Sequence, residues 1–222
     1  MSPLALTLRL AAIVSGILFF VALPIAYWIS FSRARYKFLV ESLVALPLVL
    51  PPTVLGFYLL LALGPRSPLG HWYSRLTGHT FAFTFEGLVI GSVLYSLPFA
   101  VQPMAASFSA IDSQLLAASE TLGAGRLRTF FRVIAPLSLP GLVTAVALSF
   151  AHTLGEFGVV LMIGGNIPGA TQTVSIAIYD NVQALEYGAA NEAALWLLVI
   201  SFAILSVVYG TNRRIWAAWP FK

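Results

Sequence analysis

The sequence predicts an all-α, polytopic integral membrane protein with about five transmembrane helices, and three observations support this. Of its 222 residues, 59% are hydrophobic and only 9% are charged, whereas roughly 25% are charged in an average soluble domain. The mean hydropathy is +0.90. Several apolar runs are long enough to cross a hydrocarbon core of roughly 30 Å at about 1.5 Å per residue. We therefore expect residues 1–222 to form a single transmembrane domain.

Five apolar runs have this length, and they occupy residues 4–31, 39–63, 86–111, 134–157 and 193–212. The first, of roughly 27 residues, is too long for a signal-peptide core, so we expect it to remain as an anchor. Small residues at helical spacing, such as Gly87 and Gly91, let helices approach closely. We expect the fourth run to open at Pro136, where a missing N–H costs nothing in a first helical turn.

The positive residues predict the orientation of the chain. Nine of the 12 Lys and Arg residues fall in gaps on one side of a five-span arrangement, namely Arg33, Arg35, Lys37, Arg126, Arg128, Arg132, Arg213, Arg214 and Lys222. The gap at 158–192 has none. By the positive-inside rule, the N-terminus is outside and the C-terminus is in the cytoplasm. The net charge of +4 could suggest a nucleic-acid-binding protein. The cations are scattered over short gaps, however, and do not form the basic face that such a protein has.

Two segments on the outer side are less regular. Residues 64–85 are rich in Pro, Gly and aromatic residues, which suit the headgroup region, and we expect His71 and His79 to anchor there rather than to bind metal. Residues 164–187 begin with a turn-rich stretch and then predict a short helix that does not cross the membrane, with a re-entrant element left open. The chain has no cysteine, which excludes disulfides and thiolate metal sites.

Residues 113–132 form a polar interruption between the third and fourth runs. Residues 113–122 favour a helix, Gly123 and Gly125 favour a turn, and three arginines follow among aromatic residues. The pattern predicts a short helix, a tight glycine turn and a second amphipathic element that lies across the membrane surface. One interpretation is a rigid element that fits a groove on another protein. The other is an interfacial helix that binds anionic lipid.

Residues 46–56, LPLVLPPTVLG, hold Pro47, Pro51 and Pro52 inside an apolar run. Each proline removes a backbone donor and bends a helix, and only protein or cavity water can then satisfy the freed carbonyl groups. We interpret this stretch as a bent helix that lines a translocation path. A bend that serves only helix packing is the alternative.

The helix, the glycine and a proline thirteen residues later resemble the cytoplasmic EAA loop of binding-protein-dependent ABC importer permeases. That family pattern is Glu-x-Ala-Ala, a Gly four residues after the second Ala, and a late Ile-x-Leu-Pro. Aligned on Gly123, Leu116 replaces the family Glu, and Glu120 lies one helical turn closer to the glycine. The resemblance assigns ATPase coupling to Ala118, Ser119, Glu120, Gly123, Gly125, Arg126, Arg128 and Pro136.

Residues 46–56 and 154–169 narrow the resemblance to molybdate-type permeases, although the second stretch is shared with sulfate permeases. The resemblance implies a second copy of this chain with the pore between the copies, a cytoplasmic ABC ATPase dimer, and a periplasmic or extracellular oxyanion-binding protein. Lipid surrounds the spans. Sulfate, thiosulfate and tungstate are alternative cargoes, and a stand-alone secondary transporter is disfavoured by the single intramembrane Glu.

The chain lacks the G-x-x-x-x-G-K-[ST] motif, so we expect no ATPase activity, no catalytic residue and no cofactor in it, with ATP bound by the partner. In the fourth run, Ser149, His152 and Glu156 lie at i, i+3 and i+7, on one helix face. A carboxylate repels an oxyanion, so we expect Glu156 to accept hydrogen bonds that hold the outer gate. The candidates for the pathway or gate are Pro47, Pro51, Pro52, Thr53, Ser149, His152 and Glu156.

Overall fold

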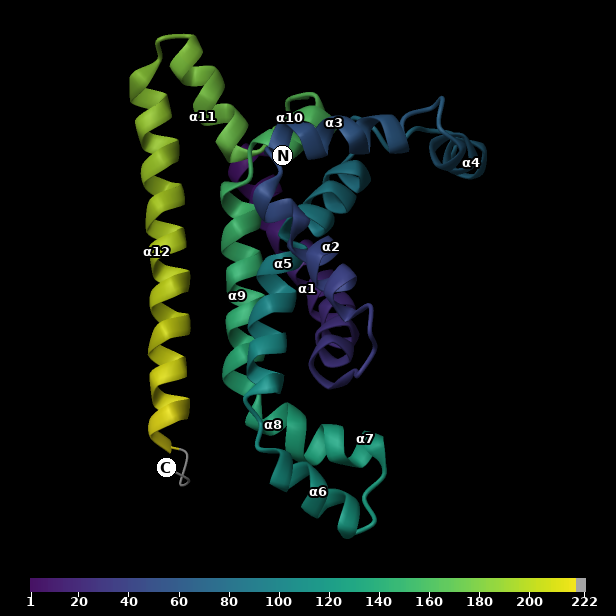
Figure 1. The fold of residues 1–222 in the computed structure, drawn as a ribbon. Coiled ribbons are helices and arrows are strands. Elements are labelled where there is room, and N and C mark those ends of the chain that lie inside the picture. The colour runs from purple at the N-terminus through teal and green to yellow at the C-terminus, as the bar shows by residue number, and fades with distance from the viewer. Residues whose placement is uncertain (219–222) are drawn as a thin grey trace.

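The computed structural model describes the backbone of residues 1–218 and the side chains of residues 1–210. This part of the chain is helical and contains no strand (Figure 1). Its elements are α1 (Pro3–Phe31), α2 (Lys37–Val49), α3 (Pro52–Leu63), α4 (Pro68–Thr77), α5 (Phe85–Ser109), α6 (Ser113–Thr121), α7 (Arg126–Thr129), the π-helix η1 (Phe130–Ile134), α8 (Ala135–Leu137), α9 (Leu139–Gly155), α10 (Gly158–Gly164), α11 (Val174–Gln183) and α12 (Tyr187–Ala218).

The predicted fold class is confirmed, but two of the five runs are not straight helices. Three helices, α1, α5 and α12, are long and apolar enough to cross a membrane within the described residues. Two bent pairs complete the five: α2 and α3 meet at 112°, and the helical stretch Arg126–Leu137 meets α9 at 72°. The predicted cytoplasmic cations Arg213, Arg214 and Lys222 lie outside the residues whose side chains are described.

The core forms where α1, α5 and α9 pack along one another (Figure 1). From α1, residues spaced three or four apart face this core, which is the spacing of one helix face. From α5 and α9, small side chains alternate with larger ones, so the helices approach closely. The fully buried members include Leu10, Val14, Leu18, Ala100, Met104, Phe108 and Ala145. This bundle is the frame that carries the two candidate sites predicted from the sequence, the segment 113–132 and the pathway residues.

The second run breaks at Leu50, directly before two prolines. Leu50 is the C-cap of α2 and donates its backbone N–H to the carbonyl of Leu46 at 3.1 Å, and α3 then begins at Pro52. Because Pro51 and Pro52 have no N–H, the α2 helix cannot continue through them. The predicted bend is therefore confirmed, although it lies at these two residues and not at Pro47, which stays inside α2. Beyond the break, α3 packs against α10, and α4 extends away from the bundle (Figure 1).

The fourth run also differs from the prediction, because Pro136 does not open it. Pro136 belongs to α8, and the helix that crosses begins at Leu139, with Pro140 in its first turn. The bend lies at Ser138 because the ring of Pro140 clashes with the carbonyl group of residue 136, four positions earlier. Ser138 then accepts the N–H of Leu142 at 3.0 Å, which starts α9.

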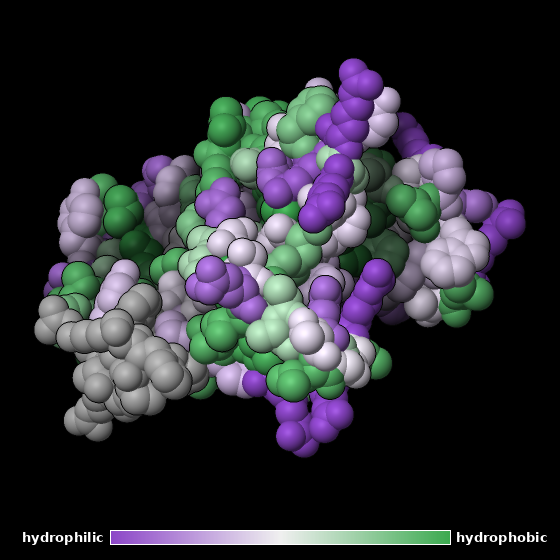
Figure 2. Space-filling view, turned by 60° about the horizontal axis from the view of Figure 1, so that its bottom comes forward, coloured by the Kyte–Doolittle hydropathy of each residue, from purple (hydrophilic) through white to green (hydrophobic). Residues whose placement is uncertain are grey.

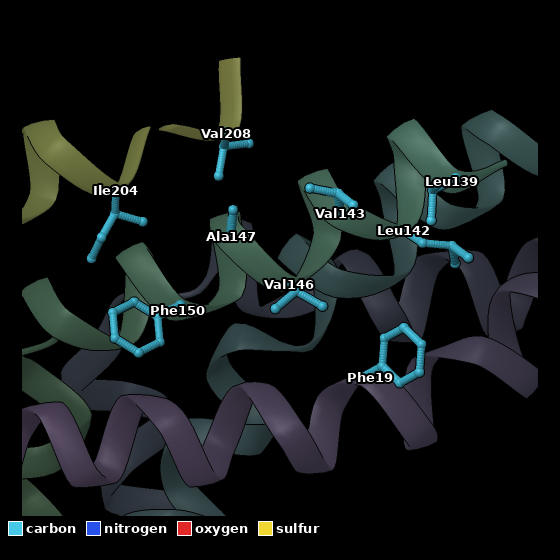
Figure 3. A pocket seen from close by; sticks show the side chains of 9 residues that line it. All are labelled: Phe19, Leu139, Leu142, Val143, Val146, Ala147, Phe150, Ile204 and Val208. Atoms are coloured by element: carbon cyan, nitrogen blue, oxygen red, sulfur yellow. The ribbon is translucent and has the colours of Figure 1, made fainter. Parts of the chain in front are cut away.

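α12 stands beside α9 and leaves an apolar groove between them. The groove has a volume of about 470 Å³, and its walls come from α1, α9 and α12. Figure 3 shows that every side chain in it is a hydrocarbon, including Phe19, Phe150 and Ile204. Such a surface is compatible with the interior of a bilayer, where no polar partner exists.

Residues 164–187 contain a short helix, α11, as predicted, and residues 64–85 contain the helix α4, which was not predicted. α11 has ten residues, about 15 Å of helix, which is too short to cross roughly 30 Å of hydrocarbon. The turn before it is fixed by Asp180, whose carboxylate accepts hydrogen bonds from Asn166 at 2.8 Å and Gln172 at 3.0 Å. The N-terminus lies at the same end of the bundle as α10 and α11, and α6 to α8 lie at the opposite end (Figure 1).

Candidate coupling segment and translocation cavity

The candidate coupling segment, residues 113–132, is a helical hairpin closed by a Schellman turn. Asp112 caps α6 by accepting the N–H of Gln114 at 2.8 Å. At the other end of α6, Gly123 donates to the carbonyl of Glu120 at 2.9 Å and Ala124 donates to that of Ser119 at 3.1 Å. Gly123 has a φ of +73°, the left-handed conformation that glycine adopts without a steric penalty. The predicted glycine turn is confirmed.

A buried hydrogen bond joins the two arms of this hairpin. The hydroxyl groups of Ser119 in α6 and Thr129 in α7 lie 2.8 Å apart, and both residues are buried. Because each hydroxyl has the other as its partner, neither is left unsatisfied in the interior. α6 and α7 are therefore held together as one unit.

The outer surface of the hairpin combines cations with large apolar side chains. Arg126 and Arg128 are exposed, and near them Leu122, Leu127 and Phe131 are 85%, 76% and 68% exposed. Figure 2, which turns this end of the molecule forward, shows hydrophilic side chains projecting among hydrophobic ones. Exposed apolar residues with a polar rim are typical of a surface that binds another protein or the membrane.

Of these exposed apolar residues, Leu122 and Leu127 were not predicted from the sequence, whereas Phe131 belongs to the aromatic residues noted among the arginines. They stand directly beside the glycines and arginines, and large apolar residues next to a turn are the signal that predicts them. Of the coupling residues named from the sequence, the exposed ones are Ala118, Glu120, Gly123, Gly125, Arg126, Arg128 and Pro136, whereas Ser119 is buried.

We expect Ser119→Ala to loosen the hairpin. The variant leaves the buried hydroxyl group of Thr129 without its partner, which costs about 1–3 kcal/mol of folding free energy. Ser119→Ala/Thr129→Val removes both hydroxyl groups and should regain most of that loss. Proteolysis of the hairpin in detergent measures the difference. Equal protease resistance of Ser119→Ala and the wild type would show that this hydrogen bond does not hold the arms.

A cavity of about 500 Å³ lies between the α2–α3 break and the end of α9. Four of the predicted pathway residues line it: Pro52, Thr53, His152 and Glu156. Tyr95 of α5, which was not among the candidates, also lines it. Pro47, Pro51 and Ser149 are not among its lining residues. The cavity thus joins two segments about 100 residues apart in the sequence.

His152 is held firmly in this cavity by α5. Its Nδ1 lies 2.9 Å from the hydroxyl oxygen of Ser96, within hydrogen-bond distance. The imidazole ring stacks on Phe99 with centroids 3.9 Å apart and also contacts Tyr95 at 4.9 Å. These contacts fix the orientation of the ring, so the cavity has a polar wall of defined shape.

Glu156 directly follows the last residue of α9, and it lines the same cavity as His152, which lies one helical turn earlier. α9 ends at Gly155, and Glu156 has an extended backbone with ψ of 134°. Ser149 is fully buried, and its hydroxyl group donates to the carbonyl of Ala145 at 2.7 Å. Of the three residues predicted on one helix face, His152 and Glu156 therefore line the cavity, and Ser149 does not.

The carboxyl group of Glu156 is buried, and neither oxygen has a hydrogen-bond partner among the described residues. The expectation that it accepts hydrogen bonds holding the outer gate stays a prediction. The hydroxyl group of Ser92 is likewise buried and unpaired. Both groups lie away from lipid, as polar groups at membrane depth usually do.

Solved structures of transporters share this fold. A chain of an inward-facing MetNI methionine ABC transporter superposes with a TM-score of 0.76 at 17% identity, over 96% of this chain and 94% of that one. A chain of a bacterial alginate ABC transporter, crystallised with an alginate-bound periplasmic protein, gives 0.77 at 18% identity, over 96% and 78%. At these identities the likeness concerns the fold alone.

Relatives found by sequence comparison are more similar to this chain than the solved structures are. The molybdenum transport system permease protein ModB of Azotobacter vinelandii is 50% identical over 213 residues, which cover 96% of this chain and 94% of that protein. ModB of Escherichia coli K12 is 36% identical, over 88% and 86%. The sulfate transport system permease protein CysT of the same bacterium is 33% identical, over 81% and 66%. Residues 9–216 match the family described as the inner membrane component of binding-protein-dependent transport systems, and the chain belongs to that family.

Proposed function

We propose that this chain is the permease subunit of an ATP-driven importer that carries molybdate across the cytoplasmic membrane. The observation that carries the proposal is the 50% identity to a molybdenum permease over 96% of the chain. The sulfate permease CysT is more distant, at 33% identity, so molybdate is the favoured oxyanion. The exposed coupling segment agrees with this function, because a permease without its own P-loop needs a surface on which an ATPase docks.

In the proposed complex, two cytoplasmic ABC ATPase subunits bind ATP and contact the coupling segments. Closure of the ATPase pair moves these segments, and the membrane helices change from inward-facing to outward-facing. A binding protein outside the membrane then releases its anion into the path. The chain itself supplies no cofactor and no catalytic residue. Its N-terminus is outside and its C-terminus is in the cytoplasm, because the cation-rich gaps then face inward.

A second copy of the chain completes the path. The cavity at Thr53, His152 and Glu156 carries polar groups, and lipid tails offer them no hydrogen bonds. Beside it, α2 and α3 expose large apolar side chains, including Val49 at 82% and Tyr58 at 62%. In a C2 pair the same surface meets itself, so the two cavities face a common space. This arrangement places the anion path between the copies.

Cysteine labelling tests the assigned path, since the natural chain has no cysteine. Thr53 is exposed and lines the cavity, whereas Ser149 of α9 is buried and does not line it. We expect Thr53→Cys to react with a small water-soluble thiol reagent and Ser149→Cys to stay unreactive in the folded dimer. Molybdate-loaded binding protein with ATP should change the rate at Thr53→Cys. Equal rates at both positions would contradict the assigned path.

The decisive experiment is reconstitution of the complex in proteoliposomes with its ATPase and binding protein. We expect molybdate-loaded binding protein to accelerate ATP hydrolysis and molybdate to accumulate inside. Sulfate-loaded binding protein is the matched control. Accumulation of sulfate in preference to molybdate would overturn the assigned cargo, and uptake without ATP would overturn the proposed class of transporter.

A further inference from the structure

We propose that four aromatic residues, Tyr27, Phe31, Phe108 and Phe130, form a joint that links the coupling segment to the membrane helices. Within this joint, Phe130 is a positioning residue: it passes the movement of the coupling segment to α1 and α5. The inference rests on the proposed function and adds to it the place where movement enters the transmembrane bundle.

The ring contacts define the joint. The ring centroid of Phe130 lies 5.8 Å from that of Tyr27 and 6.4 Å from that of Phe108, both in edge-to-face geometry. Phe31 completes the cluster at 4.9 Å from Tyr27 and 6.4 Å from Phe108. Three elements meet here: the end of α1, the end of α5, and the start of η1. Edge-to-face aromatic pairs add stability beyond the area that they bury.

The backbone of the coupling segment presents Phe130 to this cluster. Phe130 begins the π-helix η1, and its carbonyl accepts the N–H of Ala135, five residues later. Ile134 lies one turn further on the same face and is also buried. Phe131, in contrast, points to the exterior. Because Ser119 and Thr129 tie α6 to α7, the hairpin and Phe130 are connected without a flexible link.

Beside the joint, the coupling segment and α1 are separated by open space. A cavity of about 430 Å³ lies there, and residues such as Trp28, Leu116 and Arg126 line it. The contact of Phe130 with Tyr27 joins the two elements at the edge of this cavity, and Ile134 packs into the same core. Packed side chains transmit displacement because protein interiors yield little to compression.

The test is the Phe130→Ala variant, assembled with its ATPase and binding protein in proteoliposomes. Three quantities are measured: the amount of complex that co-purifies, the stimulation of ATP hydrolysis by molybdate-loaded binding protein, and the molybdate imported per ATP hydrolysed. We expect the imported molybdate per ATP and the stimulation to fall by about tenfold while ATP hydrolysis without the binding protein persists. Phe130→Leu, which keeps apolar volume, should lie between Phe130→Ala and the wild type, and it serves as the test variant if Phe130→Ala does not assemble.

Phe20→Ala is the matched control, since Phe20 is an aromatic residue of α1 that is 75% exposed and outside the joint. Phe20→Ala should import as much molybdate per ATP hydrolysed as the wild type. If Phe130 only stabilises the fold, less complex will assemble, but molybdate per ATP and the stimulation will stay unchanged in Phe130→Ala and Phe130→Leu. That result overturns the joint while wild-type import still supports the proposed function. A wild-type complex that imports no molybdate overturns the proposed function itself.

Discussion

Replacement of residues 113–132 by a Gly/Ser linker of equal length is expected to abolish ATP-driven molybdate uptake, a fall of roughly 100-fold. The linker removes the α6–α7 hairpin, its Schellman turn at Gly123 and the exposed apolar residues on its surface. The ATPase then has no shaped surface to bind, so it should also fail to co-purify. Uptake into proteoliposomes and the yield of co-purified ATPase measure both effects.

Leu122→Glu is the finer version of this experiment. Leu122 is 85% exposed, so a charge there does not disturb the core. If the hairpin binds the ATPase, the new carboxylate is buried in the interface without a partner, so less ATPase should co-purify. If it binds only lipid headgroups, the ATPase yield stays unchanged. Leu198→Ala/Val199→Ala on the exposed face of α12 serves as the control and should leave the yield and uptake at wild-type levels.

Gly141→Ala is expected to destabilise the protein strongly. A Cβ atom at this position would lie 2.3 Å from Cβ of Ser107 and 2.9 Å from the carbonyl oxygen of Pro103, both on α5. Neither atom is the end of a flexible side chain, so α9 has to move away from α5. Overpacking of this kind costs about 1–3 kcal/mol, and the midpoint of thermal unfolding in detergent falls by roughly 2–4 °C per kcal/mol.

Gly16→Ala is the matched control for this variant. Gly16 is also inside a long helix, but apart from its chain neighbours and the adjacent backbone of its own helix, no atom lies within 4 Å of the position that its Cβ would take. Alanine favours a helix by about 1 kcal/mol relative to glycine, so Gly16→Ala should be as stable as the wild type or more stable. If Gly141→Ala matches Gly16→Ala in thermal unfolding, the α5–α9 contact is not as tight as the structure places it.

Much of the architecture was predictable because it depends on local composition. The long apolar runs predicted the helices α1, α5 and α12, since a bilayer admits only segments that satisfy their own backbone hydrogen bonds. The pair Pro51–Pro52 predicted the break between α2 and α3, because neither residue can donate an N–H. Gly123 predicted the turn of the coupling segment, because its left-handed backbone favours glycine.

Other features were not predictable because they depend on contacts between distant residues. Both Pro136 and Pro140 can occupy a first helical turn, and only the structure shows that α9 begins at Leu139. Helical spacing predicted one face for Ser149, His152 and Glu156, and only the structure shows that His152 and Glu156 line the cavity while Ser149 is fully buried. The contact of His152 with Ser96 joins residues 56 positions apart, and no local pattern predicts such a contact.

The sequence by itself determined that the chain is a helical membrane protein and where its glycine turn and proline break lie, because the preference for lipid, the missing proline N–H and the glycine φ are properties of single residues and their neighbours. The tertiary structure alone decided which polar residues share the cavity and which aromatic rings meet at the coupling segment. These depend on how α1, α5 and α9 pack, and that packing is a sum over side chains far apart in the chain.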